Sequence, residues 1–519
     1  MATLLNCFND LRENCTKVEG NKAGAYGLEE AEIDYGGVSH GITLYVQKIY
    51  IFEDIDKYGI TGWIEMLDVD NIVSGFIRED HAIVGQELLR LKFRTKGSEF
   101  SVDFTDHPLH IHKIENLRTY DPGTGAVGGG ALQYRIHFCA PELMNNDRIR
   151  VSQAYEDTYS EIVKDILKNH LKTSKDVWIE ETKDIHNVVI PNMHPFDAIR
   201  WITRQCRSKK TNIPNYNFYE TTKGYRFKTM HVQAVRNTEA ENYDASDQQM
   251  SYTIPTGRDD SNYLRNMMTA QNYKFLRTGD TYEAIQKGMF ASKSIQHDSY
   301  HKNYSIKATD YQTAPGVKRP DIQSLPAGGF VHRFIPSGST VYVSDGTKYD
   351  SQHPQIEGNS ESFTEFPDSR IFFTSTGSKH AYDFADDKGV RTNDNATDQL
   401  STPLWHMQQS HDRYVQLQLD VFGVSGLQVG DMIALQTPVV GTDKSRDFDY
   451  RWSVPYYITK LVHRVNLRAD VVEYHCDLVC SAKDVMSVGR DDSLPKNGKL
   501  AGKDGKTGSM KDFSGSQER

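Results

Sequence analysis

Three histidines, His107, His110 and His112, are the nearest thing to a metal-binding cluster in the sequence. On an extended strand, His110 and His112 would point to the same face, because side chains alternate along a strand with a period of two. A neutral-histidine site also needs a third ligand and an open or fourth position. We expect instead a half-exposed strand whose Leu109 and Ile111 face the core. The sequence therefore predicts no metal site here.

A second short segment, Gly505-Lys506-Thr507, imitates the end of a phosphate-binding loop. The full pattern requires glycine five positions before Gly505, where this chain has Leu500. The loop also needs a preceding strand and a following helix, whereas these residues lie in a polar tail. No H-E-x-x-H helix and no CxxC pair occurs in the chain. We expect no catalytic residue, no cofactor and no enzyme activity.

The composition limits the class of protein. Of the 519 residues, 38% are hydrophobic, as in an ordinary folded chain. The net charge of −10 argues against a nucleic-acid binder, because such proteins need a basic surface that releases phosphate counterions. No run approaches ~18 consecutive apolar residues, and the N-terminus does not read as a secretory signal. The six cysteines are scattered, so we expect free thiols and synthesis in a reducing cytoplasm.

Short alternating strands dominate two parts of the chain and predict an α+β fold with two antiparallel β-barrel-like domains around a helix-containing middle. The expected segments are an N-terminal arm (1–40), a first β-barrel-like domain (41–145), a helical middle domain (146–215, continued in 236–311), a hairpin joining the second β-barrel-like domain (216–235 and 404–485), a loop-rich insertion (312–403) and a disordered, flexible tail (486–519). The insertion is expected to decorate the surface or bind a partner.

Two helices and a hairpin are predicted in the middle of the chain. An apolar stripe from Tyr159 to Leu171 recurs at helical spacing. Pro195 is expected in the first turn of a second helix, where its missing N–H costs nothing. A hairpin is expected to turn near Lys223 and Gly224.

A third helix is predicted to begin at Asp280, whose side chain can cap the first turn with Glu283 as its capping-box partner. Its apolar positions at helical spacing are Tyr282, Ile285 and Met289. Gly288 is placed to let the chain leave the helix, because glycine adopts the left-handed backbone that ends many helices.

The residues after this helix carry the most specific pattern in the chain. They read G-M-F-A-S-K, then I-x-H-D, then an extended run ending in D-Y. This stretch resembles the central baseplate hub subunit of contractile-tailed phages of the T-even kind, a structural virion protein. Segments near positions 86, 142 and 430 also look like that tail-hub barrel family. The family-matching positions, expected to be structural, are Gly85, Gln86, Glu87, Pro141, Glu142, Gly288, Met289, Ala291, Ser292, Lys293, His297, Asp298, Asp310, Tyr311, Gly430 and Asp431.

The resemblance implies two similar barrels in each subunit, so that three subunits form a six-barrel ring. Such a homotrimer adapts a trimeric spike to the hexameric tail tube and leaves a channel for tape measure and DNA. The implied partners are the central spike protein, the tail tube or distal tube initiator, the tape measure protein and baseplate wedge proteins. DNA is expected to pass without specific binding, and no stable membrane insertion is expected. The implied location is the virion, in the tail baseplate, after assembly in the host bacterial cytoplasm.

Two alternatives stay open. A type VI secretion or contractile-injection spike protein shares these barrels, but should continue into an OB domain and a needle of short β repeats. This chain has a polar tail there instead. A tail-associated cell-wall or polysaccharide hydrolase would use the segment 312–403, and assays on peptidoglycan or capsule would reveal it.

Overall fold

The structure, a computed structural model, describes residues 23–35, 37–69, 83, 85–98, 100–120, 131–210, 212, 214–230, 250–253, 266–298, 303–310, 341–342, 348–349, 367–376, 395–437, 452, 455–467, 473–482, 500–501 and 507–508. The first 22 residues, most of the expected insertion and nearly all of the expected tail lie outside this range, so the predictions made for them stay predictions. Within the described part, no helix is long and apolar enough to cross a membrane.

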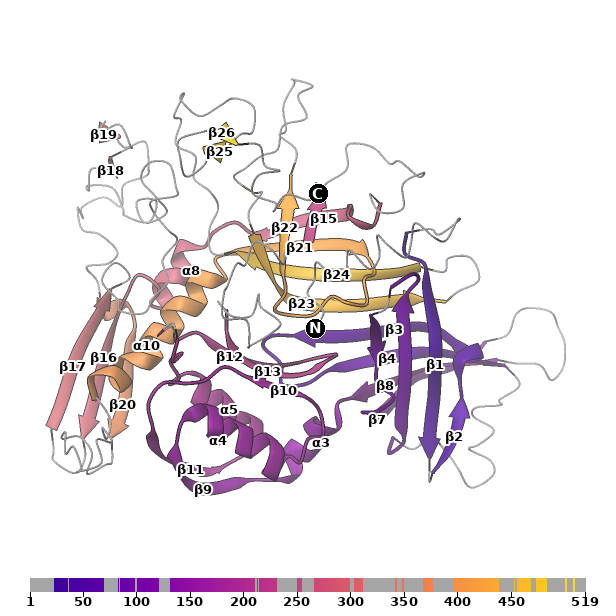
Figure 1. Cartoon of the computed structure of the whole chain (residues 1–519), viewed down its shortest axis with the longest axis horizontal. Helices are drawn as coiled ribbons and strands as arrows, with labels where there is room; N and C mark the ends of the chain where they lie inside the picture. The colour runs from indigo at the N-terminus through magenta and orange to yellow at the C-terminus, as the bar shows by residue number, and fades with distance from the viewer. Residues whose placement is uncertain are drawn as a thin grey trace.

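The chain is mostly β-structure, and 14 of the described strands form one sheet (Figure 1). Its main path runs β15 (Ala270–Arg277), β21 (Val415–Phe422), β24 (Glu473–Ala482), β23 (Pro455–Asn466), β3 (Val46–Asp54), β4 (Thr61–Val69), β8 (Ala131–Cys139), β7 (Leu109–Tyr120), β5 (Leu88–Thr95), β1 (Tyr26–Tyr35) and β2 (Val38–Gly41). Off this path, β14 (Met250–Thr253) pairs with β22 (Met432–Gln436), β22 pairs with β23, and β6 (Ser101–Asp103) pairs with β5.

The strands predicted for two separate barrel-like domains are thus joined, and the described sheet does not close into a barrel. The junction is the antiparallel pair β3–β23, where Ile49 lies opposite Val465 and Ile51 opposite His463. The prediction of two separate barrels is wrong in this respect. Alternation identifies a strand and its inward face, but it does not reveal which strand edges meet.

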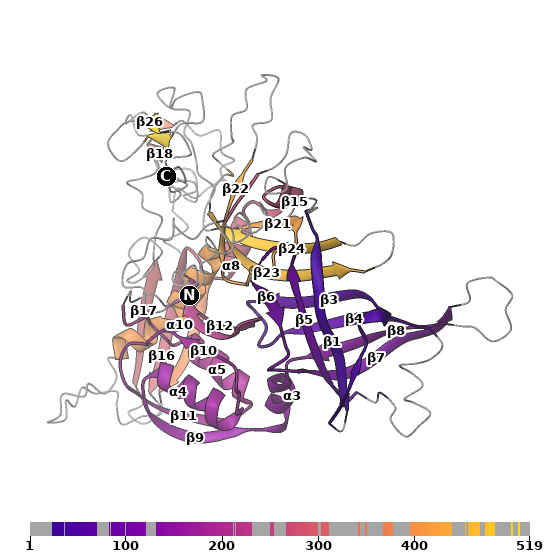
Figure 2. The ribbon, with the colours of Figure 1, turned by 45° about the vertical axis from the view of Figure 1, so that its right-hand side comes forward.

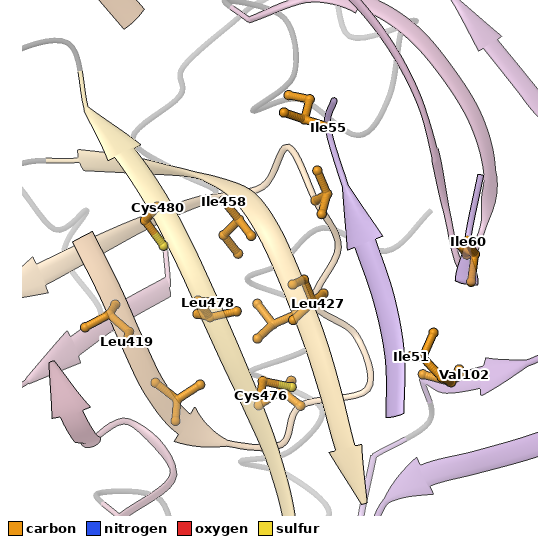
Figure 3. Packing of buried hydrophobic residues seen from close by; sticks show 14 of the residues in the cluster. Ile51, Ile55, Ile60, Val102, Leu419, Leu427, Ile458, Cys476, Leu478 and Cys480 are labelled. Carbon is orange, nitrogen blue, oxygen red and sulfur yellow. The ribbon is translucent and has the colours of Figure 1, made fainter. Parts of the chain in front are cut away.

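The core follows the predicted alternation and crosses the junction. In β5, Leu89, Leu91 and Phe93 are fully buried, whereas Arg90 and Lys92 between them are partly exposed. Figure 3 shows Ile51 of the first half in the same cluster as Leu478 of the second half. Each such side chain contributes about 1.5–3 kcal/mol by leaving water. One shared core therefore holds the two halves together.

The strand β1 lies in the segment that the sequence predicts as an arm. It pairs with β5 along nearly its whole length, and its Ala31 and Ile33 are buried. A register shift between Leu28 and Glu30 interrupts the alternation, and acidic residues occupy the outward positions. These two features hide the strand pattern, so the prediction of an arm over 1–40 is wrong for β1 and β2.

A smaller unit beside the sheet has its own core. Its elements are α3 (Pro141–Arg148), β9 (Val151–Asp157), α4 (Tyr159–Asp165), the single-turn η2 (Ile166–His170), β10 (Val177–Ile179), β11 (His186–Met193), α5 (Pro195–Thr203), β12 (Tyr216–Thr221) and β13 (Gly224–Thr229). The predicted apolar stripe is buried in α4 and η2, Pro195 opens α5, and the hairpin turns at Gly224 with φ +119°. These three predictions are confirmed.

The hairpin β12–β13 pairs with β10 of this smaller unit, in the order β10-β13-β12. Its Phe218, Tyr225 and Phe227 belong to the core of that unit. The structure differs here from the prediction, which assigns the hairpin to the second barrel. The hairpin's own sequence specifies its turn but not the sheet that it joins.

A third sheet has the order β17-β16-β20 and consists of β16 (Ala291–Asp298), β17 (Asn303–Asp310) and β20 (Ile371–Thr376). Around it lie α8 (Thr281–Gln286), η5 (Pro367–Ser369) and α10 (Asn395–Asp412), and α10 contacts all three strands. The strand β20 and the first half of α10 come from the expected loop-rich insertion. Pro403 inside α10 concealed this helix, because proline normally ends a helical pattern.

The remaining described elements are short. They are η1 (Thr43–Tyr45), the pair β18 (Val341–Tyr342) with β19 (Lys348–Tyr349), and the pair β25 (Leu500–Ala501) with β26 (Thr507–Gly508).

Candidate functional site: the family-matching turns and a buried charge junction

The helix α8 begins and ends where the sequence predicts. A side-chain oxygen of Asp280 accepts a hydrogen bond from the Glu283 backbone N–H at 2.8 Å, which satisfies one free donor of the first turn. At the other end, the Met289 N–H donates to the Ala284 carbonyl at 2.9 Å, the longer of the two bonds of a Schellman motif.

Gly288 is required at this helix end for two separate reasons. Its φ is +73°, a left-handed conformation that costs little only for glycine. A Cβ atom at this position would also stand 2.7 Å from Cβ of Arg370. Gly288 therefore ends the helix and allows the close approach of the chain before β20.

The predicted apolar face of α8 is partly wrong. Met289 is fully buried, but the Tyr282 side chain is 73% exposed. The helix proper has six residues and ends before Met289. Helical spacing therefore does not extend to Met289, and Ala284 is the buried residue within the helix.

Most of the family-matching residues after Gly288 lie on β16 and on its hairpin partner β17. Ala291 and Ser292 are buried. Lys293 forms an ion pair with Asp368 of η5, and its N–H donates to the Arg370 carbonyl at 2.8 Å. His297 is exposed. In the backbone register of the β16–β17 hairpin, Asp298 lies opposite Asn303 and Asp310 opposite Ala291. Tyr311 lies outside the described residues.

The sheet β17-β16-β20 has an unusual distribution of side chains. Toward α10 it buries small polar and mixed residues, namely Ser292, Ser294, Gln296, Thr309 and Phe372. On the opposite face, Ile306 is 53% exposed, Ile371 41% and Phe373 74%. Ile306 and Phe373 both lie next to Ile295 in register, so they form one apolar row across the sheet.

Two matching turns, one in each half of the large sheet, contain a glycine and a buried carboxylate that accepts from backbone N–H groups of the turn. The Glu87 carboxylate accepts from the N–H groups of Gly85 and the following residue, both at 3.0 Å. The Asp431 carboxylate accepts from the Gln428 N–H at 2.9 Å. Gly85 and Gly430 both have φ +90°, and both carboxylates are buried. These matching residues shape the backbone of the two turns.

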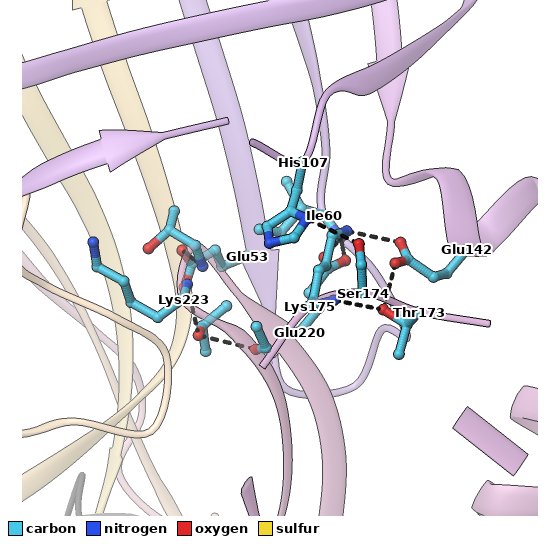
Figure 4. A network of polar contacts seen from close by, with 12 residues as sticks. Glu53, Ile60, His107, Glu142, Thr173, Ser174, Lys175, Glu220 and Lys223 are labelled. Carbon is cyan, nitrogen blue, oxygen red and sulfur yellow. Dashed lines mark hydrogen bonds and ion pairs between the residues drawn. The ribbon is translucent and has the colours of Figure 1, made fainter. Parts of the chain in front are cut away.

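The matching residue Glu142, on α3, belongs to a buried charge cluster (Figure 4). The Lys175 ammonium donates to Glu142 at 2.7 Å and to Glu220 at 2.5 Å. Thr173 donates its hydroxyl to Glu142 at 2.6 Å, and the backbone N–H of Ile60 donates to Glu220 at 2.8 Å. The cluster therefore ties α3 and β12 of the smaller unit to the loop before β4 of the large sheet.

In this cluster the Lys175 ammonium is bonded to two carboxylates, so the negative groups outnumber the positive one. The pKa values of the three groups follow from this charge imbalance. Burial alone would lower the pKa of Lys175, but Glu220 and Glu142 outweigh it and raise that pKa. Burial works to raise the pKa of Glu142, yet Lys175 and the Thr173 hydroxyl hold it below its usual value. The pKa of Glu220 is raised, first by burial and also by Glu142. Lys175 therefore stays charged, and Glu220 is the easier carboxylate to protonate.

A second buried contact, at Glu53, connects three parts of the molecule. Its carboxylate accepts from the Thr222 N–H of the β12–β13 hairpin at 3.0 Å and from the Val429 N–H of the second half at 3.1 Å. The His463 ring on β23 lies 3.8 Å from the same carboxylate. We call Glu53, His463 and the Lys175 cluster the charge junction.

The His463 imidazole is fully buried and bonded to the Tyr474 hydroxyl at 2.6 Å. Burial opposes its charged form, but Cys476 and Glu53 outweigh this effect and raise the pKa of His463 to about 9. The His463 imidazole is consequently charged at neutral pH.

The outward face of the large sheet carries similar ion clusters in its two halves. In the first half, Arg135 lies 3.8 Å from Glu65 and 4.0 Å from Glu115. In the second half, Arg464 lies 3.3 Å from Asp420 and 3.4 Å from Asp477. Arg135 on β8 lies between carboxylates of the two adjacent strands, β4 and β7, whereas both carboxylates near Arg464 lie on one side of β23, on β24 and on β21 beyond it.

The three histidines of the sequence pattern do not converge. His107 bonds to the Ser174 hydroxyl at 3.1 Å. Burial lowers the pKa of His110 and of His112. Leu109 and Ile111 are fully buried, as predicted for this strand. Among the described residues, no group of three or more His, Cys, Asp or Glu side chains is placed to hold a metal ion.

The residues 37–41, G-V-S-H-G, match the G-x-S-x-G pattern of a hydrolase nucleophile. That pattern needs a sharp turn from a strand into a helix. Here the serine lies in β2 of an exposed hairpin, opposite Asp34. Its hydroxyl donates to Glu32 at 2.5 Å. The pattern therefore lacks the structural context of a nucleophile elbow.

Sequence reasoning missed Glu53, Lys175 and Glu220, which the junction brings together. Two of them carried a signal, because Glu53 and Glu220 are acidic residues inside strands with apolar neighbours. A charged residue in a buried strand is normally paired. Lys175 stands in a polar loop, where nothing in the sequence marks it as buried.

Several solved structures are similar to this chain, with sequence identities of about 10% and TM-scores below 0.5. No protein-family model matches the chain, and no curated protein matches it. A tail protein from Neisseria meningitidis is 10% identical, with a TM-score of 0.44 over 89% of this chain and 98% of that one. The 43 kDa tail protein of prophage MuSo2 from Shewanella oneidensis has 10% identity and a TM-score of 0.43, covering 89% and 100%. A type VI secretion system component of E. coli has 10% identity and a TM-score of 0.36, covering 91% and 80%.

Proposed function

We propose that this chain is a central baseplate hub subunit of a contractile-tailed phage, a structural virion protein that forms a homotrimeric ring. The resemblance of the segment from Gly288 to Tyr311 motivates the family. The observation that carries the proposal is that two structural features occur twice within one chain. Each half of one sheet contains a glycine turn with a buried carboxylate that accepts backbone N–H bonds, and an arginine paired with two carboxylates.

Such doubling suits a protein that converts threefold into sixfold symmetry. Three copies would present six similar halves to a hexameric tail tube, while the trimer as a whole would match a trimeric spike. The halves differ in detail: a glutamate fixes the first turn and an aspartate the second. Six positions in the ring would therefore be similar rather than identical.

The mechanism proposed is mechanical, without a catalytic step. The charge junction joins the first half, the second half and the smaller unit through hydrogen bonds with little freedom. Buried and paired charges favour one relative arrangement of these parts, because a displacement would leave a charge unpaired. A subunit built in this way can transmit force between spike and tube without changing shape internally.

Passage of DNA through such a ring without specific binding fits the charges. The net charge is −10, and the arginines at the centres of the outward clusters already face carboxylates. Cations that are paired in this way add little to phosphate binding, because affinity for DNA depends on counterion release by free cations.

The proposal is tested by measuring the mass and shape of the purified chain with light scattering after size exclusion and with negative-stain imaging. A ring with a central hole and three times the mass of the 59.1 kDa chain is expected. A chain that stays monomeric, both alone and with trimeric spike protein added, would contradict the proposal. Clearing of peptidoglycan or capsule by the same preparation would favour the hydrolase instead.

A further inference from the structure

The large sheet has two open ends. In the strand order of the described residues, β15 pairs only with β21 at one end, and β2 pairs only with β1 at the other. The two strands lie apart in Figure 1, and Figure 2 shows β15 beside β21 at its end of the sheet. An open edge presents unpaired backbone N–H and C=O groups, which is a template for pairing with another strand.

The strand β15 is a basic edge with exposed apolar side chains. It contains Lys274 and Arg277 and no acidic residue. Most of its side chains reach solvent, including Tyr273 at 39% and Leu276 at 45% exposure. Arg277 forms an ion pair with Glu283 of α8, whereas Lys274 has no acidic partner among the described residues.

The opposite end, the β1–β2 hairpin, is acidic. Residues 26–41 contain three glutamates and one aspartate, with no lysine or arginine. Asp34 and Glu29 are paired with Arg90 and Arg94 of β5, whereas Glu32 accepts from the Ser39 hydroxyl and forms no ion pair among the described residues. Val38, in the edge strand β2, is 56% exposed, and Leu44 in the adjacent η1 is 89% exposed. The two ends of the sheet therefore combine exposed apolar groups with opposite charge.

We propose that β15 of one copy of this chain pairs with β2 of the next copy, so that the sheet continues between subunits. This inference rests on the proposed ring and names its subunit interface. The two edges differ, so the contact is heterologous, and repeated heterologous contacts close into a ring when the rotation allows it. Backbone pairing supplies affinity, and the basic and acidic edges select this pairing over like edges, which would repel.

Cross-linking of two single-cysteine variants tests the pairing directly. In a background with Cys7→Ser and Cys15→Ser, Val38→Cys is made in one tagged chain and Leu276→Cys in an untagged one, since the four other cysteines are buried. A short bis-maleimide reagent is added to each variant alone and to the equimolar mixture. We expect a tagged–untagged product in the mixture and no dimer from either variant alone.

Three results would count against the pairing. Homodimer products from either variant alone would mean that like edges meet. A ring of three copies without any mixed product would overturn the interface while leaving the proposed function standing. A wild-type chain that forms no ring under any condition would remove both proposals.

Charge reversal gives a second, independent test. Lys274→Glu should raise the dissociation constant of the assembled ring about tenfold, as expected when an attraction at an interface becomes a repulsion. Adding Glu32→Lys on the opposite edge should restore most of the lost affinity. Lys209→Glu, at an exposed position of the smaller unit, is the matched control and should leave assembly unchanged. Equal assembly by Lys274→Glu and the control would contradict the interface.

Discussion

The charge junction and the β17-β16-β20 sheet place side chains in opposite ways. At the junction, Lys175, Glu53 and their partners are charged, buried and held by several hydrogen bonds. In the three-stranded sheet, Phe373 and Ile306 are apolar and exposed, while small polar residues face α10. Both regions contain family-matching residues, so a sequence match alone does not separate internal contacts from surface.

This difference indicates how each of the two regions is stabilised. The junction is complete within one chain, because each of its charges has a partner from another element. The outer row of the small sheet has no such complement among the described residues, and clustered exposed apolar groups are typical of surfaces that meet another molecule. The junction therefore determines the shape of the subunit, whereas the small sheet contributes a surface.

The largest expected effect is at Lys175. Lys175→Ala leaves two buried carboxylates without their cation, which should lower the free energy of unfolding by about 3–5 kcal/mol. Urea titration followed by circular dichroism measures this. Lys209→Ala removes the exposed pair with Glu181 and should change nothing measurable.

A charge-free version of the same cluster separates charge from packing. Lys175→Met combined with Glu142→Gln and Glu220→Gln should recover much of the loss, because no buried charge then remains unpaired. If the triple variant is as unstable as Lys175→Ala, packing rather than charge holds the junction together.

Two adjacent phenylalanines of β20 sharpen the contrast within the small sheet. Phe372 is 9% exposed, and its ring lies 5.0 Å from that of His406. Phe372→Ala should cost about 3 kcal/mol in chemical denaturation. Phe373→Ala, at the 74% exposed position, should change the stability of the isolated chain by less than about 0.5 kcal/mol. Equal losses at the two positions would show that the outer row is covered within the single chain.

An intermediate effect is expected at the helix end. Gly288→Val meets both a left-handed backbone and Cβ of Arg370, so it should destabilise the chain by about 2 kcal/mol and lower the yield of soluble trimer. Gly27→Val is the control, because Gly27 lies in β1 away from the proposed edge and a Cβ there meets no atom within 4 Å. Yield and assembly equal to wild type would contradict the role of Gly288 as a helix stop.

A further prediction concerns the dependence of stability on pH. The pKa of His463 is raised from 6.5 to about 9 in the folded chain, so the stability gained from its charged form is fully present below pH 6.5 and is lost as the pH rises through 9. The urea midpoint should fall between pH 7 and pH 9.5. His463→Gln should flatten that decline. A wild-type midpoint that stays level over this range would mean that the ring is neutral in the folded chain.

Sequence reasoning predicted local structure well and assembly of the parts less well. The cap at Asp280, the stop at Gly288, the turn at Gly224 and the inward face of β5 are local and follow from backbone chemistry. The joining of two halves at β3–β23 depends on strand edges that no alternation pattern encodes. The burial of Lys175 likewise depends on two glutamates far away in the chain.

The most direct test of the central claim is a single-particle reconstruction of the assembled protein, calculated without imposed symmetry. We expect three copies around an axis, with six similar sheet halves in which the Arg135 and Arg464 clusters alternate. The sheet should be continuous within each copy from β3 to β23. A particle with another number of copies, or one whose two halves do not occupy similar positions around the axis, would contradict the claim that one chain supplies two units of a ring.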